Sequence, residues 1–285
     1  MKAEDRPFQL YGIFGNPLGH TLSPALQEAA FRAIGLKAFY LPFELSPAEF
    51  GKVTRRMKNL LLDGVNITVP YKEKILSRLD RVERSARAIG AVNTLVRQGD
   101  RWTGFNTDWT GFVTSLEKEG RFRCRGKRAL LLGAGGSARA VAYGLAKRSV
   151  KSITIANRTR SKAERIVKNF KKLFPKVEFQ ALSLRGGNDA NGIDLVVNAT
   201  SVGLGRGDRA LVSPGNFPKK TLFVDLIYNP PRTRMLRLAA RSGRRTLNGA
   251  GMLLYQGAEA FRLWTGKKAP LAAMKKALRE GLHAH

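Results

Sequence analysis

The sequence predicts an α/β protein with two domains, in which helices pack against largely parallel sheets. The chain has 285 residues, which is long enough for two hydrophobic cores. Short apolar runs alternate with longer helical stretches in both halves, as expected of parallel strands connected by helices. A glycine cluster at 133–136 separates an apolar run from an alanine-rich stretch, which indicates a buried strand that turns tightly into a helix.

The first hundred residues contain a regular alternation of strands and helices. A helix over 24–34 follows Ser23, a residue type that is favoured as N-cap. A second helix over 46–59 begins with Ser46 and carries Glu49 three residues later, the pattern of a capping box. Around these helices we expect strands at 10–15, 38–43, 64–69 and 92–97.

The second half repeats the alternation and then ends in helices. With helices between them, strands are expected at 129–133, 152–156, 177–180, 194–198 and 222–226. The tail is expected to be helical over 252–261 and 271–282. We therefore divide the chain into a first domain at 1–110, a second domain with a parallel sheet at 111–244, and C-terminal helices at 245–285 that pack on the first domain.

The composition is that of an ordinary globular chain. Hydrophobic residues make up 43% of it, and no apolar stretch approaches the ~20 residues that a membrane span needs. The first residues lack the apolar core of a signal peptide. Cys124 is the only cysteine, so no intrachain disulfide can form. We therefore expect a cytoplasmic protein without a membrane partner.

The net charge of +30 is high and unevenly distributed. Residues 1–110 carry a net +5, residues 111–244 a net +20 and residues 245–285 a net +5. Such a field would attract a polyanionic cofactor, and it would attract nucleic acid without specificity. The sequence has no zinc-finger spacing or aromatic RNA-binding motif, so we expect no specific nucleic-acid partner. The ordinary interpretation of most of these charges is a solvated basic surface.

The glycine cluster has the spacing Gly133-x-Gly135-x-x-Ala138 of a dinucleotide-binding turn, in which a helix N-terminus faces a pyrophosphate. The next strand ends at 157–159, where an NAD site usually has an acidic residue for the ribose. Here Arg158 stands at that place, with Lys162 one turn later, and both would attract a 2′-phosphate. The pattern favours a Rossmann-type domain that binds NADP(H). The alternative is an ordinary strand–turn–helix unit with basic surface residues.

Several polar residues of the first half fall where strands end, which is where open α/β sheets bind ligands. Thr21 and Ser23 begin a helix and could bind a carboxylate, although capping alone would account for Ser23. Asn66 and Thr68 share one face of a strand, and a proline then leads into Lys72. Further polar groups follow at 90–94 and 104–108. Together these residues predict a small polar cavity.

Elimination favours a site centred on lysine. Of the three histidines, His283 and His285 lie at the end of the chain, and His20 lies in a helix-entry turn. The sequence has no cluster of His, Cys and carboxylates with metal-ligand spacing, so we expect no metal. If a proton must accompany a hydride, Lys72 is the best donor, with Asp108 as its partner.

Over nearly its whole length the chain resembles shikimate dehydrogenase. The segments that carry the resemblance are 14–17, 23–24, 66–72, 90–94, 106–108, 133–138, 157–159, 198–201 and 248–253, with Gln256 and 264–266. So many matches in order far exceed what a shared cofactor fold would give. The resemblance implies reversible NADPH-dependent reduction of 3-dehydroshikimate to shikimate, a step toward chorismate and the aromatic amino acids.

The resemblance also implies a role for particular residues, and it makes Lys72 and Asp108 the catalytic pair. The substrate contacts that it implies are Thr21, Ser23, Thr68, Lys72, Asn93, Asp108, Tyr228 and Gln256. The cofactor contacts that it implies are Gly133, Gly135, Gly136, Ser137, Ala138, Asn157, Arg158, Thr159, Lys162, Leu226 and Gly249. Among these, Thr21 and Ser23 would hold the substrate carboxylate.

Two departures from the family pattern leave alternatives open. Thr21 stands where the family usually has serine, which leaves tolerance of quinate open. Lys162 stands where it often has arginine, so the preference for NADP could be weaker. The alternatives are therefore a quinate/shikimate dehydrogenase with relaxed substrate or cofactor use, a noncatalytic relative, and an unrelated NADP enzyme. The sequence does not separate a monomer from a homodimer, nor proton donation by Lys72 from charge stabilisation alone.

Overall fold

The computed structural model describes residues 7–19, 21–184, 190–205 and 207–283, so the candidate His20 lies outside the described residues. The chain divides into two compact units. Unit 1 comprises Met1–Gly111 and Leu254–His285, and unit 2 comprises Phe112–Leu253. The divisions fall within helices α4 (Asp108–Lys118) and α8 (Ala250–Thr265).

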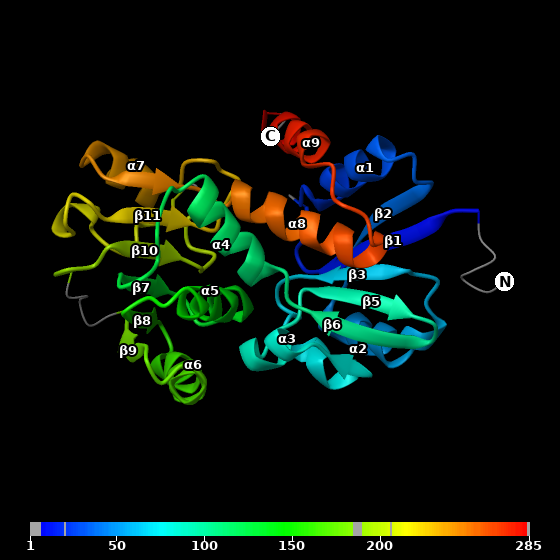
Figure 1. The fold of residues 1–285 in the computed structure, drawn as a ribbon, viewed down its shortest axis with the longest axis horizontal. Coiled ribbons are helices and arrows are strands. Elements are labelled where there is room, and N and C mark those ends of the chain that lie inside the picture. Colours follow the sequence, from blue (N-terminus) through cyan, green and yellow to red (C-terminus); the bar gives the residue numbers. More distant parts are fainter. Residues whose placement is uncertain (1–6, 20, 185–189, 206, 284–285) are drawn as a thin grey trace. The chain divides into compact units, whose positions relative to one another are not determined.

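Unit 1 is built on a six-stranded sheet of order β2-β1-β3-β5-β6-β4 (Figure 1). The strands are β1 (Gln9–Gly15), β2 (Ala38–Glu44), β3 (Gly64–Ile67), β4 (Arg81–Val82), β5 (Thr94–Gln98) and β6 (Arg101–Phe105). β1 runs parallel to β2 and β3, but β5 is antiparallel to β3 and β6. The expected parallel sheet is therefore mixed in this unit. A tight turn with Gly99 at a φ of +63° joins β5 to β6, which allows the two strands to pair directly.

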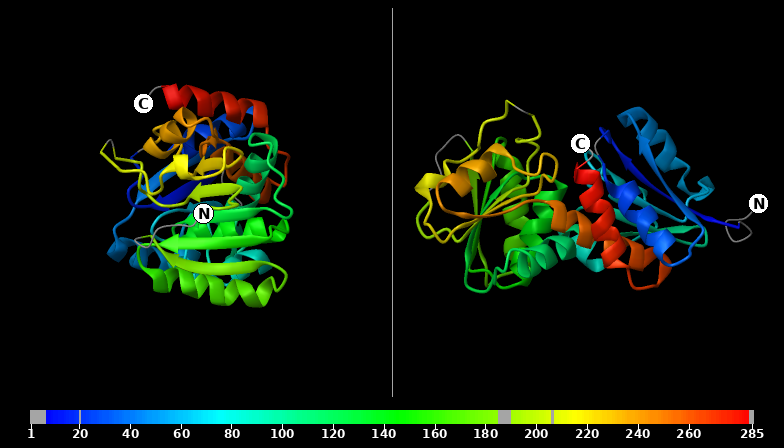
Figure 2. Two further views of the ribbon diagram at one scale, coloured as in Figure 1. Left: turned by 90° about the vertical axis from the view of Figure 1, so that its left-hand side faces the viewer. Right: turned by 90° about the horizontal axis from the view of Figure 1, so that it is seen from above.

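Helices cover both faces of this sheet (Figure 2). They are α1 (Ser23–Ala33), α2 (Pro47–Arg55), α3 (Arg84–Ile89), α8 and α9 (Leu271–His283). On one face, Tyr11 of β1 stacks on Phe31 of α1 and on Trp264 of α8, with ring centroids 5.1 and 4.8 Å apart. On the other, Phe50 of α2 stacks on Tyr71 at 3.9 Å. The core of unit 1 thus has two layers, one on each side of the strands.

Unit 2 has a fully parallel sheet of order β12-β11-β10-β7-β8-β9. Its strands are β7 (Arg128–Leu132), β8 (Ser152–Asn157), β9 (Glu178–Ser183), β10 (Leu195–Asn198), β11 (Leu222–Asp225) and β12 (Arg245–Leu247). Helices α5 (Gly136–Lys147), α6 (Arg160–Leu173) and α7 (Arg234–Arg241) connect them (Figure 1). The strand order reverses at β7, between β8 and β10, which is where doubly wound sheets bind ligands.

The local predictions hold for most elements and differ at a few. Ser46 and Glu49 form the expected capping box, and the helix expected over 46–59 is α2 followed by a 3₁₀ turn at Met57–Asn59. Residues 245–253 belong to unit 2, not to the C-terminal helices of unit 1, because β12 pairs with β11. The elements that the sequence did not predict are β4, β6, α3 and β12.

Cys124 is 4% exposed and lies in unit 2. Burial raises the pKa of its thiol to about 12. Because the thiolate is the reactive form, this cysteine is chemically inert in the folded unit. Among the described residues we find no helix with both the length and the apolar character of a membrane span, and no cluster of three or more His, Cys, Asp or Glu side chains suited to a metal.

Candidate active site

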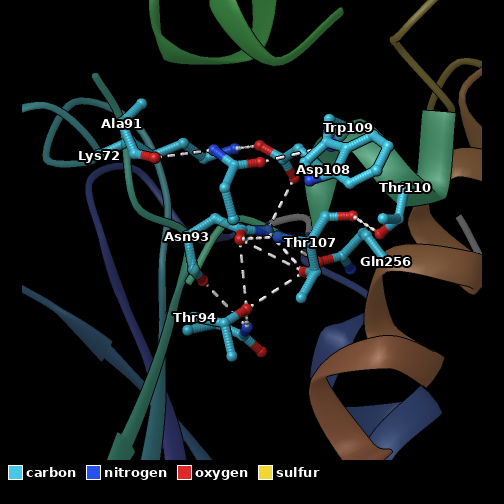
Figure 3. A network of polar contacts seen from close by, with 11 residues as sticks. Lys72, Ala91, Asn93, Thr94, Thr107, Asp108, Trp109, Thr110 and Gln256 are labelled. Carbon is cyan, nitrogen blue, oxygen red and sulfur yellow. Dashed lines mark hydrogen bonds and ion pairs between the residues drawn. The ribbon is translucent and has the colours of Figure 1, made fainter. Parts of the chain in front are cut away.

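Lys72 and Asp108 form a buried ion pair in unit 1 (Figure 3). Lys72 lies in the turn after β3, and Asp108 is the first residue of α4. The Lys72 Nζ is 2.6 Å from the Asp108 Oδ2, and the two side chains are only 12% and 5% exposed. The backbone fixes the lysine turn, because the Val92 amide donates to the Lys72 carbonyl at 2.8 Å. Two groups that are 36 residues apart in sequence thus meet where water has little access.

Asn93 holds the other oxygen of the aspartate. Its Nδ2 donates to Asp108 Oδ1 at 2.8 Å and reaches Gln256 Oε1 of α8 at 3.3 Å. Its Oδ1 accepts from the Thr107 amide at 2.7 Å. The structure therefore brings Lys72, Asn93, Asp108 and Gln256 into one hydrogen-bonded group, as Figure 3 shows.

Gly111 determines how closely Gln256 approaches. A Cβ on Gly111 would lie 2.6 Å from the backbone nitrogen of Gln256 and 2.7 Å from its Cβ. Only a glycine allows α4 and α8 to pack this closely at that point. The sequence alone indicated no role for Gly111, because a glycine's packing partner cannot be seen in the sequence.

The N-terminus of α1 differs from the prediction. Leu22 is the N-cap residue, and no side chain caps the helix there, so the expectation that Ser23 is the cap is wrong. The Ser23 amide instead donates to Thr21 Oγ1 at 3.3 Å. Ser23 is 8% exposed, and its side chain interacts with the Tyr40 hydroxyl, which counters the rise in the Tyr40 pKa that burial causes. The Ser23 side chain is therefore directed to Tyr40 of β2 and does not cap α1.

At the start of α4, Asn106 rather than Asp108 binds a backbone amide of the first turn. Asn106 Oδ1 accepts from the Trp109 amide at 3.3 Å, and Asn106 Nδ2 donates to the Ala91 carbonyl at 2.9 Å. A neighbouring residue thus serves the helix end, while both oxygens of Asp108 are used by Lys72 and Asn93.

Thr68 follows β3 and lies against the end of β1. Its methyl group would be 2.3 Å from a Cβ on Gly15, so a glycine at the end of β1 is what permits this contact. The Thr68 amide donates to the Phe14 carbonyl at 2.9 Å, which keeps the two strand ends together. The backbone hydrogen bond to Phe14 therefore fixes the position of Thr68, which is a predicted substrate contact.

The predicted dinucleotide turn joins β7 to α5 in unit 2. Gly133 has a φ of +110°, and a Cβ there would be 3.0 Å from the Ala199 carbonyl oxygen. Gly135 is the N-cap of α5 and has open space where a Cβ would be. Ala138 is fully buried under the helix. The turn is therefore narrow on the protein side and open at the helix N-terminus, which fits a bound pyrophosphate.

Basic residues surround the end of β8. Asn157 Nδ2 donates to the Thr159 carbonyl at 2.9 Å, which closes the turn into α6. Arg158, Thr159 and Lys162 are exposed. Glu164, one turn further along α6, pairs with Arg160 at 2.9 Å. The surface at this strand end is cationic and suits a phosphate rather than a bare ribose.

Leu226 and Gly249 touch each other in unit 2. A Cβ on Gly249 would be only 1.9 Å from the Leu226 carbonyl oxygen, and the Gly249 amide donates to the Ile227 carbonyl at 3.1 Å. Tyr228 is half-buried in the same loop. It belongs to unit 2, whereas the other predicted substrate contacts belong to unit 1.

Asp225, which the sequence did not single out, holds this loop in place. Burial raises the pKa of its carboxyl, against hydrogen bonds from Thr233, Asn198 and the Ile227 amide that lower it. The Thr233 hydroxyl donates at 2.7 Å and the Asn198 Nδ2 at 3.1 Å. Asp225 ties the ends of β10 and β11 to the start of α7.

Three family descriptions match successive parts of the chain. Residues 13–95 match the shikimate dehydrogenase substrate binding domain. Residues 116–233 match shikimate / quinate 5-dehydrogenase, and residues 249–279 match the shikimate 5′-dehydrogenase C-terminal domain.

Individual relatives agree over nearly the full length. The shikimate dehydrogenase (NADP(+)) of Methanopyrus kandleri is 40% identical over 283 residues, which cover 98% of this chain and 97% of the relative. A solved shikimate dehydrogenase in complex with NADP+ is 36% identical, with a TM-score of 0.88 over 96% of each chain. The enzyme of Thermus thermophilus, in complex with NADP(H) and shikimate, is 36% identical with a TM-score of 0.85 over 96% of this chain and 100% of the other. This chain belongs to the shikimate dehydrogenase family.

Proposed function

We propose that the chain catalyses the reversible, NADPH-dependent reduction of 3-dehydroshikimate to shikimate. The observation that carries the proposal is the buried Lys72–Asp108 pair, which lies where strands of unit 1 end. Asn93 donates to Asp108 and to Gln256, and so joins the pair to α8. The relatives named for NADP(+)-dependent shikimate dehydrogenase support the choice of reaction and cofactor.

The turn of unit 2 suits the cofactor. Gly133, Gly135, Gly136, Ser137 and Ala138 would hold the pyrophosphate at the N-terminus of α5. Asn157, Arg158, Thr159 and Lys162 would hold the adenosine 2′-phosphate, and Leu226 and Gly249 would approach the nicotinamide. When bound, NADPH supplies the hydride.

Lys72 acts on the substrate oxygen. As hydride reaches the ketone carbon, negative charge grows on that oxygen, and the Lys72 ammonium stabilises it and donates the proton that completes the alcohol. Asp108 orients Lys72, and it accepts a hydrogen bond from a neighbouring ring hydroxyl. In the reverse direction Lys72 takes the proton back.

The remaining polar residues bind the ring. Thr21 and Ser23 hold the carboxylate, and the ring hydroxyls contact Thr68, Asn93, Gln256 and Tyr228. We further propose that the enzyme works in the cytoplasm as a monomer or homodimer.

The cofactor assignment predicts a higher kcat/KM with NADP+ than with NAD+ in shikimate oxidation. Arg158→Ala removes a charged donor to the 2′-phosphate and should lower kcat/KM for NADP+ by roughly 10- to 100-fold, with little effect on NAD+. Arg160→Ala is the matched control, since Arg160 lies in the same turn but pairs with Glu164. A wild type that prefers NAD+ would refute the role given to this turn.

The same assay with quinate tests the substrate. We expect shikimate to be the better substrate, because quinate carries an additional hydroxyl beside its carboxylate, where Thr21 would place a methyl group. Equal kcat/KM for quinate would instead favour a quinate/shikimate dehydrogenase with relaxed specificity.

A further inference from the structure

The hydrogen-bonded group around Asp108 continues into the sheet of unit 1. Asn66 of β3 is 5% exposed, and Thr94 at the start of β5 is fully buried. Asn66 Nδ2 donates to the Asn93 carbonyl and to Thr94 Oγ1, both at 3.1 Å. Thr94 Oγ1 donates to Asn93 Oδ1 at 3.2 Å. Asn93 donates to the Asp108 carboxylate, and two residues of the sheet, Asn66 and Thr94, donate hydrogen bonds to Asn93.

Tyr40 extends this network to the start of α1. It lies on β2, is 1% exposed, and its hydroxyl donates to Asn66 Oδ1 at 2.7 Å. The same hydroxyl interacts with the Ser23 side chain, and this interaction partly offsets the rise in the Tyr40 pKa that burial causes.

The network therefore connects the two ends of the proposed substrate site through buried groups. Ser23 stands at the carboxylate end, and Asn93 with Asp108 stands at the reacting end. A rigid ring that carries its carboxylate and its ketone at fixed positions must meet both ends at once, so their separation decides whether the reaction geometry is reached. Tyr40 and Asn66 bridge that separation through the sheet.

We propose that Tyr40 is a positioning residue, whose hydroxyl fixes Ser23 relative to Asn93 and Asp108 and so sets the site to the length of the substrate. This inference rests on the proposed function, because it concerns the same site. It assigns a role to a tyrosine that has the sequence signature of an ordinary aromatic residue in a strand.

Tyr11 provides a matched control. It pairs with Tyr40 in the register of β1 and β2, so both side chains point to the same face of the sheet, and both are 1% exposed. The Tyr11 hydroxyl, however, donates to Gln9 at 2.8 Å, at the opposite end of β1 from the strand ends that carry the site. Tyr11→Phe therefore removes a similar hydroxyl without touching the network.

The test measures kcat and KM for shikimate and KM for NADP+ in Tyr40→Phe, Tyr11→Phe and wild type, with a thermal melt of each. We expect Tyr40→Phe to lower kcat/KM for shikimate roughly tenfold, the size of one lost buried hydrogen bond, with KM for NADP+ unchanged. Tyr11→Phe should stay within about twofold of wild type, even if its melt shifts as much.

A double variant separates positioning from general loosening. If Tyr40 acts through Ser23, the combined effect of Ser23→Ala and Tyr40→Phe on kcat/KM should fall short of the product of the single effects. Should Tyr40→Phe not fold, Thr94→Val and Thr94→Ser replace it: valine should lower kcat/KM roughly tenfold, and serine, which keeps the hydroxyl, should restore it.

The outcomes are distinct. Three results would each overturn the role of the network and leave the proposed function intact. They are a folded Tyr40→Phe with kcat/KM within about twofold of wild type, strictly multiplicative effects in the double variant, and equal activity of the two Thr94 variants. A wild type that does not turn over shikimate with NADP+ would overturn the proposed function and this inference with it.

Discussion

Lys72→Met should lower kcat by roughly 10²- to 10⁴-fold, the usual contribution of a positioned acid or base. Methionine keeps much of the apolar stem and removes the ammonium, which is 2.6 Å from Asp108 on a side chain that is 12% exposed. The affinity for NADP+ should change little, because the predicted cofactor contacts belong to unit 2. Steady-state kinetics with shikimate and NADP+, together with a binding titration of NADP+, measure both quantities.

Asp108→Asn is the companion variant. It should also lower kcat, and it should weaken shikimate binding if the carboxylate holds a ring hydroxyl. The double variant should be little worse than the worse single one, since groups that act as a unit are not additive. Near-normal kcat in Lys72→Met would remove Lys72 from the mechanism and leave Asp108, His20 or bound water as the proton source.

Gly249→Ala should destabilise unit 2 by about 3 kcal/mol and lower its melting temperature by about 10 °C. The new methyl group would be 1.9 Å from the Leu226 carbonyl oxygen, and a backbone atom cannot move aside as a flexible side chain can. Because the same contact shapes the loop proposed to face the nicotinamide, NADP+ binding should weaken as well.

Gly215→Ala is the control for this variant, since Gly215 is exposed and a Cβ there has nothing within 4 Å. Its melting temperature should match that of the wild type. Calorimetry of the wild type and the two variants measures the three melting temperatures. An unchanged melting temperature in Gly249→Ala would contradict the prediction and would show that the backbone after β11 shifts at little cost in stability.

The sequence was sufficient for the architecture because strand and helix patterns are local. The glycine turn, the strands of unit 2 and the Ser46 capping box all depend on neighbouring residues, and the structure has them. Strand direction in unit 1 depends on which strands pair, which is not local. The antiparallel direction of β5 therefore escaped prediction. In unit 2, β12 was missed because a strand of three residues gives little periodicity.

The residues of the site also differ in whether a local pattern or a partner distant in the sequence reveals them. The polar residues at strand ends could be predicted because an open sheet gathers its ligand residues there. Gln256 entered the prediction only through the family resemblance, since a polar residue on a helix gives no sign of its partner. Ser23 was misjudged as a cap, because Tyr40, with which its side chain interacts, lies on β2 and is part of an apolar run.

The distribution of two rare residue types gives each unit its own spectroscopic or chemical reporter. All three tryptophans, Trp102, Trp109 and Trp264, lie in unit 1, and the single cysteine lies buried in unit 2. Tryptophan emission therefore follows the opening of the substrate half, while the rate of Cys124 alkylation follows the opening of the cofactor half. Added NADP+ and added shikimate would each slow the opening of the unit they bind, so unaltered protein can reveal whether the halves unfold together or apart.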